Sequence, residues 1–268
     1  MLKIKEKLYI DNVKRIKHYS NEKNISVYKI VNIKKCLNSN VDKPRNFSDK
    51  NSVNDKKLDN NISRAKSRVK ELGLCNIWDY FATITLDKKK YDRYNLKQFK
   101  TDLSQYIANL NKIYKIKIRY ILIPEQHKDG AWHMHGFFSG IPLSFMEQFD
   151  LSKPLDKYIV DNYETVMNFP KMAEKFGFVS FDMIRDQEKA VNYLIKYITK
   201  DLAKCVNELG AHMYYSSNRL NKAKDIIKGT STAIDIPFAF ENEYCSVLWT
   251  KDKTLVNTVY SDIIANNY

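Results

Sequence analysis

The sequence PEQHKDGAWHMHGFFSG, residues 124–140, decides the fold because it places two β-rich segments on either side of a short turn. The second segment, Trp132–Ser139, begins with two histidines one residue apart, and Glu125 lies before the turn. Successive side chains of a strand point to opposite faces, so His133 and His135 share one face. At about 3.3 Å per residue, the two imidazoles lie roughly 7 Å apart along that face. Two imidazoles at this spacing are able to bind a single metal ion.

The length of the turn decides whether Glu125 faces the histidines. A two-residue turn would point this carboxylate to the opposite face of the hairpin. A three-residue loop over residues 128–130, with Gly130 left-handed, pairs Glu125 with His133 instead. We expect this second arrangement, because glycine occupies the last loop position. His127 then shares the same face as a neighbour or an alternate ligand, although histidines spaced in this way also occur in strands where they only satisfy hydrogen bonds.

A second chemically distinct pattern lies in AVNYLIKYITKD, residues 190–201. At about 100° per residue, one narrow helical arc holds the apolar residues Val191, Leu194, Ile195, Ile198 and Leu202. The opposite side holds two phenols and two ammonium groups, from Tyr193, Lys196, Tyr197 and Lys200. These tyrosines either cover the edge of the sheet as packing residues or act as nucleophiles, since a metal ion and a lysine stabilise a phenolate.

The remaining pattern predicts an α+β fold. Alternating β-forming segments predict strands over residues 79–86, 119–124, 132–139 and 177–184. Apolar periodicity predicts helices over residues 62–72, 96–114 and 187–204, with short helical pieces in 142–176 and an edge strand or loop in 210–220. The order strand, helix, hairpin, strand, helix indicates a central antiparallel sheet flanked by helices.

Composition divides the chain into three parts. Residues 1–61 are expected to form a basic, partly disordered N-terminal extension, because polar and turn-forming residues crowd positions 38–61. Residues 62–220 hold the predicted sheet and helices and are of catalytic-domain size. Residues 221–268 form a C-terminal extension that matches no pattern.

The formal charge of +14 is concentrated at one end of the chain. Residues 1–70 hold 19 Lys and Arg against 7 Asp and Glu, a net +12. A basic region of this kind is typical of an arm that binds nucleic acid. AT-rich coding sequence is the alternative explanation, because Lys, Asn, Ile and Tyr are abundant together.

Several classes of protein are excluded. No apolar run approaches the roughly 18 residues needed to span a bilayer, and the charged N-terminus is unlike a signal peptide, so we expect a soluble cytoplasmic protein. No phosphate-binding or dinucleotide-binding glycine pattern is present, which excludes an attached NTP-driven motor. The distant cysteines indicate neither disulfides nor a cysteine zinc site and are expected to be small core residues, namely Cys36, Cys75, Cys205 and Cys245.

Three motifs in order resemble the HUH endonuclease superfamily, specifically the rolling-circle replication initiators of plasmids and single-stranded DNA phages. The strand motif FATIT, residues 81–85, is similar to the first motif of that family, and HMH, residues 133–135, to the metal-binding second. The pattern Y-x-x-K-Y-x-x-K over residues 193–200 is similar to the two-tyrosine third motif. Glu125 stands eight residues before the first histidine, as the carboxylate ligand does in related viral initiators.

The resemblance implies a metal-dependent nicking and rejoining activity for an HUH domain over residues 62–220. It implies that Mg²⁺ or Mn²⁺ is held by Glu125, His133 and His135, with His127 as a further candidate. It implies that Tyr193 attacks the DNA to give a 5′-phosphotyrosine and a free 3′-OH, that Lys196 positions the phosphate or the nucleophile, and that Tyr197 makes a second transfer. The implied partners are single-stranded DNA at a replication origin, in hairpin form, and the helicase and polymerase of a bacterial host.

Other functions remain open at this point. Within the same chemistry the alternatives are an HUH transposase or a relaxase, although relaxases usually place the nucleophile near the N-terminus, whereas Tyr193 follows the histidines. From other classes, the chain is a non-catalytic nucleic-acid-binding protein or a zinc hydrolase, because a carboxylate with two histidines also suits zinc. Tyr214, Tyr215 and Arg219 are expected either to pack or to stack on bases beside the site.

Overall fold

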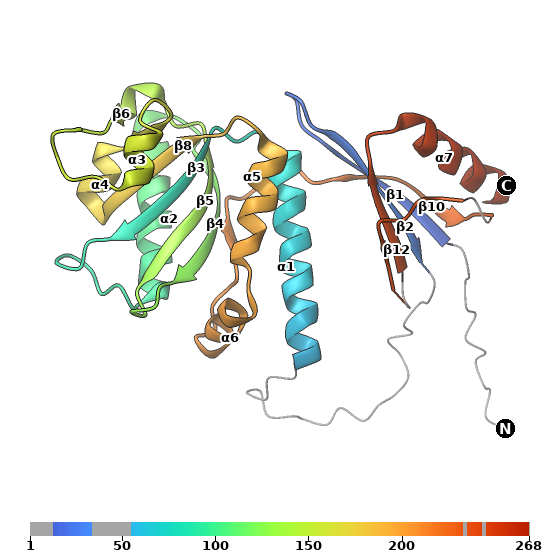
Figure 1. Cartoon of the computed structure of the whole chain (residues 1–268), viewed down its shortest axis with the longest axis horizontal. Coiled ribbons are helices and arrows are strands. Elements are labelled where there is room, and N and C mark those ends of the chain that lie inside the picture. The colour runs from blue at the N-terminus through green and yellow to red at the C-terminus, as the bar shows by residue number, and fades with distance from the viewer. Residues whose placement is uncertain (1–12, 34–54, 233–234, 243–244, 268) are drawn as a thin grey trace. The chain divides into compact units, whose positions relative to one another are not determined.

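The computed structural model describes residues 13–33, 55–232, 235–242 and 245–267, with the side chains of residues 55–57 excepted (Figure 1). The chain divides into a larger unit, Asn51–Leu220, and a split unit that combines Met1–Lys50 with Asn221–Tyr268. The loop or disordered linker expected over residues 38–61 lies outside the described residues as far as residue 54, and the expectation is wrong for residues 55–61, which are helical.

The larger unit is built on a seven-stranded sheet in the order β6-β7-β8-β3-β5-β4-β9. Its strands are β3 (Tyr80–Leu86), β4 (Arg119–Gln126), β5 (Trp132–Ser139), β6 (Glu147–Gln148), β7 (Val166–Asn168), β8 (Gly177–Met183) and β9 (Tyr215–Ser216). All neighbouring strands pair antiparallel. The predicted α+β class with an antiparallel sheet is therefore confirmed.

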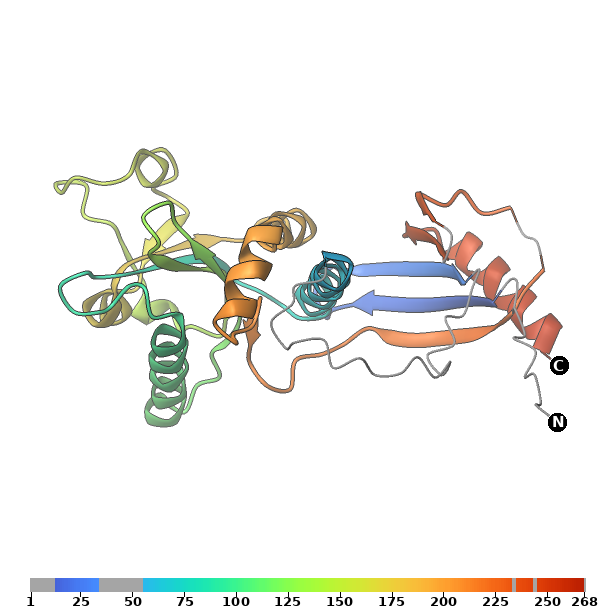
Figure 2. The ribbon, with the colours of Figure 1, turned by 90° about the horizontal axis from the view of Figure 1, so that it is seen from below.

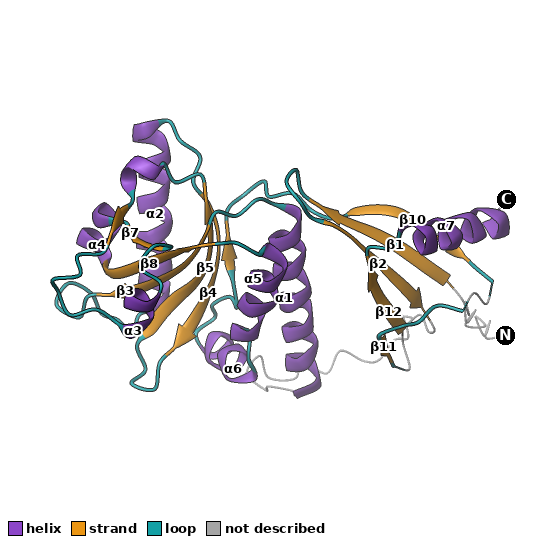
Figure 3. Ribbon diagram, turned by 45° about the horizontal axis from the view of Figure 1, so that its top comes forward, coloured by secondary structure: helices purple, strands orange, loops and turns teal. Residues whose placement is uncertain are grey.

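Helices cover both faces of this sheet. They are α1 (Asp55–Cys75), α2 (Leu96–Tyr114), α3 (Lys157–Asp161), α4 (Pro170–Phe176), α5 (Gln187–Leu194) and α6 (Lys200–Glu208), with short 3₁₀ turns η1 (Leu143–Phe145) and η2 (Ile195–Tyr197). Figures 1 and 3 show α2 on one side of the strands and α1, α5 and α6 on the other. The tyrosine-bearing segment α5–η2 therefore belongs to a different layer from α2.

Alternation along the strands gives the two faces of the sheet different chemistry. Residues on the face beneath α2 and α4 form a fully buried apolar layer that includes Ile84, Met134, Phe138 and Phe181. The opposite face of the same strands carries hydroxyl, imidazole and carboxylate groups, from Thr83, Thr85, Glu125, His133 and His135. The period of two between strand residues thus separates the core from the candidate site.

Helix α2 has the predicted bounds because its ends are chemically marked. The side chain of Asn95 accepts a hydrogen bond from the Gln98 N–H at 3.0 Å and caps the first turn. Lys115 ends the helix in a left-handed conformation, with φ at 54°. The buried side chains include Phe99 and Leu103 of the predicted apolar face.

The prediction of a single helix over residues 187–204 is wrong, because this segment forms three elements, α5, η2 and α6. Ile198 leaves helical geometry with ψ at 86°, and the hydroxyl of Thr199 accepts a hydrogen bond from the Leu202 N–H at 3.1 Å. Thr199 is thus the N-cap of a new helix whose first turn contains Asp201. A capping threonine followed by an acidic residue is a usual helix start, so the sequence did contain a signal for this break.

Helix α1 is longer than predicted, since it begins at Asp55 and ends at Cys75. Gly73 does not stop it. A Cβ at this position would lie 2.6 Å from Cγ2 of Val191, so the glycine allows α5 to approach α1 closely. The Gln187 side chain joins the same helices by donating hydrogen bonds of 2.7 Å to the carbonyl oxygens of Gly73 and Asn76.

The split unit is a second sheet, in the order β10-β1-β2-β12-β11, with one helix. Its elements are β1 (Val13–Ser20), β2 (Ser26–Ile33), β10 (Lys224–Thr230), β11 (Phe240–Glu241), β12 (Cys245–Thr250) and α7 (Lys253–Asn267). Figure 2 shows β10 beside β1 and β2. The core of the unit joins Ile16, Ile30 and Leu248 to residues of α7 such as Val259. The two segments expected as separate extensions therefore pair in one sheet.

Part of the basic N-terminal charge is used inside the split unit. The Lys14 ammonium is buried and donates hydrogen bonds of 2.7 Å to the Ser231 hydroxyl and the Thr232 carbonyl oxygen. Arg15 pairs with Asp225 at 2.6 Å. The charge excess of this region is therefore only partly available to an external polyanion.

Of the described cysteines, only Cys75 is buried as expected. Cys205 and Cys245 are half-buried, and Cys36 lies outside the described residues. Within the described ranges, none of the helices combines the length and apolar character required to cross a bilayer.

Candidate active site

The hairpin between β4 and β5 has the predicted three-residue loop. The His127 N–H donates to the Ala131 carbonyl oxygen at 2.9 Å, and the Gly130 N–H donates to the His127 carbonyl oxygen at 2.8 Å. Gly130 is left-handed, with φ at +85°, a conformation that glycine adopts without steric cost. Glu125 consequently pairs with His133 across the ladder, and the predicted register is confirmed.

Two threonines of β3 position the two histidines. Thr83 pairs with His135 and Thr85 with His133 in the antiparallel ladder. Their hydroxyls are hydrogen-bonded to the imidazole Nδ1 atoms, at 3.1 Å for His135 and 2.9 Å for His133. Because Nδ1 is occupied in both rings, Nε2 is the atom that each ring has left for a ligand.

This role of the threonines was missed at the level of sequence. The signal was present, because T-x-T in residues 83–85 has the same period of two as H-x-H in residues 133–135. Matching periods become contacts only when two strands pair in the right register, and the pairing of β3 with β5 is a long-range event.

The carboxylate of Glu125 lies against His135. Its Oε2 is 2.8 Å from Nε2 of His135, yet the contact lacks hydrogen-bond geometry, so this buried nitrogen has no hydrogen-bond partner among the described residues. As the side chains lie, no group of three His, Cys, Asp or Glu in the described part of the chain is gathered around one point that could hold a metal ion. The Glu125 side chain is 41% exposed and has room to turn.

Both imidazoles are uncharged near neutral pH. Burial lowers the pKa of His133 to about 4, helped by the neighbouring His127 and His135. Burial likewise lowers the pKa of His135 to about 4, with a smaller effect of His127. A neutral imidazole with an unpaired nitrogen beside a carboxylate is donor chemistry that suits a divalent transition-metal ion, so these residues fit such an ion.

His127 stands next to these groups without joining the pair of threonine-held rings. Its ring stacks on that of His133 with centroids 3.7 Å apart and planes 6° from parallel. This position agrees with its expected role as a neighbour of the donor set.

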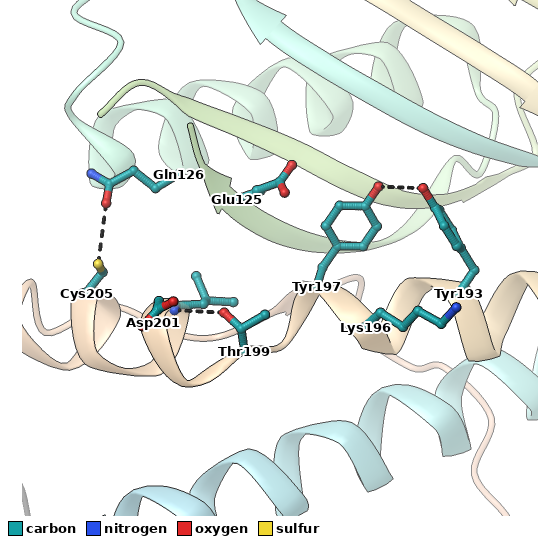
Figure 4. Close-up of a pocket in the computed structure, with 9 residues that line it drawn as sticks. Glu125, Gln126, Tyr193, Lys196, Tyr197, Thr199, Asp201 and Cys205 are labelled. Carbon is teal, nitrogen blue, oxygen red and sulfur yellow. Dashed lines mark hydrogen bonds between the residues drawn. The ribbon is translucent and has the colours of Figure 1, made fainter. Parts of the chain in front are cut away.

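The two tyrosines meet above the histidines. The ring of Tyr197 stacks on that of His135, with centroids 4.4 Å apart. The hydroxyls of Tyr193 and Tyr197 are hydrogen-bonded at 3.1 Å, as Figure 4 shows. Phe81 of β3 contacts Tyr193 edge-on at 5.5 Å between centroids. The structure therefore brings the first, second and third sequence motifs together.

The two lysines of the predicted patch separate. Lys196 stays beside the tyrosines, with Nζ 5.8 Å from the ring centroid of Tyr193. Lys200 lies beyond the helix break and pairs with Asp59 of α1 at 3.0 Å. The prediction of four residues on one helical face is wrong for Lys200, because the break at residues 198–199 changes the direction of the chain.

The environment disfavours ionisation of Tyr197. Burial raises the pKa of this phenol, and the hydrogen bond with Tyr193 and the negative charge of Glu125 raise it further. Tyr193 is the more accessible of the two, with 49% of its surface exposed.

A cavity of about 430 Å³ joins these groups on one side of the tyrosines. Glu125, Tyr193, Lys196 and Tyr197 all line it. A volume of this size lies within the range of ligand pockets, roughly 300–1,000 Å³.

Tyr214, Tyr215 and Arg219, expected either to pack or to stack on bases, do not line the cavity that contains Glu125. Tyr214 and Tyr215 line another cavity of about 730 Å³ together with Arg64 of α1. This cavity shares no lining residue with the cavity that contains Glu125. Arg219 lies in the chain beyond β9 in a left-handed conformation, with φ at 59°.

Comparison with known proteins gives one result. Residues 79–202 match the sequence model of a family described as replication-associated proteins of the ORF2 type, a segment that runs from β3 into α6. No curated protein and no solved structure gave a significant match. The matched segment contains every side chain that lines the cavity with Glu125 except Cys205. The similarity supports a role for the protein in DNA replication, as a protein of the replication-initiator type.

Proposed function

We propose that this protein nicks and rejoins single-stranded DNA through a covalent phosphotyrosine intermediate and thereby initiates rolling-circle replication. The observation that carries the proposal is the meeting of two phenols, 3.1 Å apart, over a face with two histidines and a glutamate. The match of this segment to replication-associated proteins supports DNA as the substrate.

Tyr193 is the proposed first nucleophile. Its phenol is exposed, whereas burial holds the pKa of Tyr197 above its usual range. Lys196 supplies positive charge within the same cavity. A cation beside a phenol stabilises the phenolate and neutralises charge on a phosphate, which is what an oxygen nucleophile needs here.

The chemical step exchanges one phosphate ester for another. The phenolic oxygen of Tyr193 forms a bond to phosphorus, and the bond from phosphorus to the 3′ oxygen of the preceding nucleotide breaks. The phenol gives up its proton, and the departing 3′ oxygen takes up a proton. The products are a DNA 5′-phosphate esterified to tyrosine and a free 3′-OH, which is able to prime synthesis. Reversal of the same exchange rejoins a strand.

Glu125, His133 and His135 are the residues proposed to hold Mg²⁺ or Mn²⁺, with His127 as a neighbour. When bound, such an ion would offset negative charge on the scissile phosphate. The threonines would fix the orientation of both rings. Tyr197, which shares its hydrogen bond with Tyr193, is proposed to make the second transfer that ends a round of replication. We infer that the origin DNA is presented as a single-stranded hairpin and that a host helicase and polymerase act with the protein.

The test is formation of a covalent adduct. The full chain is incubated with Mn²⁺ and overlapping single-stranded oligonucleotides that cover its own replicon, labelled at the 3′ end, and adducts that resist SDS are counted. We expect one oligonucleotide to give an adduct that retains the 3′ label. Absence of an adduct with all oligonucleotides would contradict the proposal.

Phenylalanine variants assign the nucleophiles. We expect Tyr193→Phe to abolish the first adduct, and Tyr197→Phe to preserve it while it reduces strand rejoining. Tyr214→Phe, which removes a phenol from the other cavity, is the matched control and should leave both steps unchanged. Wild-type adduct levels in Tyr193→Phe would show that the first nucleophile is another residue.

A further inference from the structure

A further cavity, the second with both tyrosines in its wall, lies on the other side of the tyrosine pair. It has a volume of about 700 Å³, and Tyr193 and Tyr197 contribute to its wall as they do to the wall of the cavity with Glu125. A DNA strand that reaches these phenols from the side of Glu125 therefore has a second compartment directly beyond them.

Aromatic and apolar side chains form the walls of this second cavity. Phe81 projects from the face of β3 that carries the threonines, and Tyr158 of α3, which is 54% exposed, also lines the cavity. Met183 at the end of β8 adds a further exposed apolar side chain. Exposed aromatic walls are the surfaces on which unpaired bases stack.

Two carboxylates line this cavity, Asp182 and Asp186, and Asp186 is the one that pairs with Lys189. Asp182 of β8 is half-buried and lines the cavity. Its Oδ2 accepts a hydrogen bond of 2.5 Å from the Tyr158 hydroxyl, which holds the carboxylate in place. Because Tyr158 occupies Oδ2, Oδ1 is the oxygen left to accept a hydrogen bond from a ligand.

Two cations also line the cavity, Arg185 and Lys189. Lys189 is 87% exposed and pairs with Asp186 at 3.3 Å, and Arg185 donates a hydrogen bond of 3.0 Å to Thr165. Exposed cations suit the phosphates of a nucleic acid strand, whereas a half-buried carboxylate among aromatic side chains repels phosphate and suits a base edge.

We propose that this cavity is a base-recognition subsite, in which Asp182, held by Tyr158, accepts a hydrogen bond from the exocyclic amino group of an unstacked nucleotide. The inference rests on the proposed function for the identity of the ligand as single-stranded DNA. Adenine, cytosine and guanine carry such an amino group. Thymine presents carbonyl oxygens at the corresponding positions, so the subsite discriminates against thymine at one position near the nick.

The test measures binding as well as reaction. Fluorescence anisotropy gives the affinity of the full chain for the replicon oligonucleotide that it binds most tightly, whether or not this oligonucleotide forms an adduct. The same measurement is made on a set in which thymine replaces each non-thymine nucleotide in turn. We expect one replacement to weaken binding by about 10-fold or more. Adduct formation on the same set is measured in parallel.

Three variants connect that position to the subsite. Asp182→Asn replaces one acceptor oxygen by a donor, so we expect the penalty for thymine at that position to fall to less than about threefold. Tyr158→Phe removes the hydroxyl that holds the carboxylate and should reduce the penalty in part. Asp161→Asn is the matched control, because it removes an exposed carboxylate from the same helix α3 outside the cavity, and it should leave the penalty unchanged.

The outcomes separate the two proposals. One outcome is that the wild-type chain forms no adduct but binds the thymine-substituted oligonucleotide more weakly, and that Asp182→Asn abolishes this difference in binding. This outcome would overturn the proposed reaction and leave the subsite in place. Adducts with normal yield but no position sensitive to thymine, or a sensitive position unaffected by Asp182→Asn and Tyr158→Phe, would overturn the subsite. Circular dichroism establishes folding, and if Asp182→Asn fails to fold, Tyr158→Phe decides.

Discussion

At the scale of single residues, Thr83 and Thr85 determine how the two imidazoles are presented. Each hydroxyl occupies one Nδ1 atom, so the ring cannot turn without loss of a hydrogen bond. Groups that hold a ligating histidine in this way typically change metal affinity by about 10- to 100-fold.

We therefore expect Thr83→Val and Thr85→Val each to weaken Mn²⁺ binding by about 10- to 100-fold, because valine keeps the shape but loses the hydroxyl. Electron paramagnetic resonance of free Mn²⁺ measures the affinity without any catalytic step. Thr83→Ser and Thr85→Ser restore the hydroxyl and should restore the affinity. Equal affinities of the valine and serine variants would contradict a positioning role.

Gly136, directly after the second histidine, holds the two strands of the hairpin at their observed spacing. A Cβ at this position would lie 1.8 Å from the carbonyl oxygen of Ile121. Gly136→Ala is thus expected to separate β4 from β5 and to lower the free energy of unfolding by at least about 1 kcal/mol. Urea denaturation measures this change.

The same substitution should weaken Mn²⁺ binding, since Glu125 and His133 are on the two strands that separate. Gly210→Asn is the control: nothing lies within 4 Å of a Cβ there, and asparagine tolerates the left-handed backbone at φ +61°. A stability of Gly136→Ala equal to that of this control would disprove the packing argument.

At the scale of elements, the break between η2 and α6 determines which lysine lies beside the tyrosines. Lys196 lines the cavity with the tyrosines, whereas Lys200 pairs with Asp59 outside it. We expect Lys196→Ala to slow adduct formation on the order of 100-fold, as removal of one charge-stabilising group does in other active sites. Lys200→Ala should leave the rate unchanged, because an exposed ion pair contributes at most about 1 kcal/mol and only to stability.

Single-turnover rates with the labelled oligonucleotide make this comparison directly. The two variants carry the same substitution on residues four apart, so each serves as the control of the other. Equal loss of rate in both would mean that the continuous helix predicted from the sequence describes the reacting state better than the broken one.

At the scale of the whole molecule, the split unit joins the two ends of the described chain through one polar network. Lys14 of β1 donates to Ser231, and the Ser231 and Thr232 hydroxyls are hydrogen-bonded to Asp262 of α7. Burial alone would raise the pKa of Asp262, but the hydrogen bonds from Ser231 and Thr232 and the charge of Lys14 lower this pKa overall. Burial lowers the pKa of Lys14.

The sign of the pH dependence follows from the lowered pKa of Asp262. Its contribution to folding is complete above the ordinary carboxyl pKa of about 3.9 and is lost as the pH falls through the lower value of the folded state. We expect Asp262→Asn to accelerate hydrogen exchange in β10 and α7 at pH 7 and to have a smaller effect near pH 3. Exchange rates are corrected for their intrinsic pH dependence.

Asp235→Asn, at an exposed position of the same unit, is the control and should change exchange little at either pH. An effect of Asp262→Asn that is equal at pH 7 and pH 3 would show that the carboxylate charge does not stabilise the unit.

Local patterns were sufficient for much of the larger unit. The bounds of α2 and β5 agree with those predicted, since caps, turns and alternation are encoded within a few neighbouring residues. The loop over residues 128–130 and the register of Glu125 with His133 followed from one glycine. The helix break at Thr199 was local too, but a continuous apolar arc concealed the cap.

The split unit was not predicted, for a different physical reason. Its sheet pairs β1 with β10, so Val13 lies opposite Thr230 across more than 200 positions of sequence. Neither segment identifies its partner, because pairing over such a distance depends on packing in the folded chain rather than on the local pattern of either strand.

The sequence by itself determined the strands and helices around the site, the face that His133 and His135 share, and the turn that brings Glu125 to them, because each depends on backbone geometry over a few residues. Only the tertiary structure decided that Thr83 and Thr85 hold the imidazoles, that Lys196 rather than Lys200 accompanies the tyrosines, and that Asp182 and Tyr158 form a second compartment beyond them. Those relations are contacts between side chains brought together by packing, and packing depends on the whole sheet and its helices rather than on any one segment.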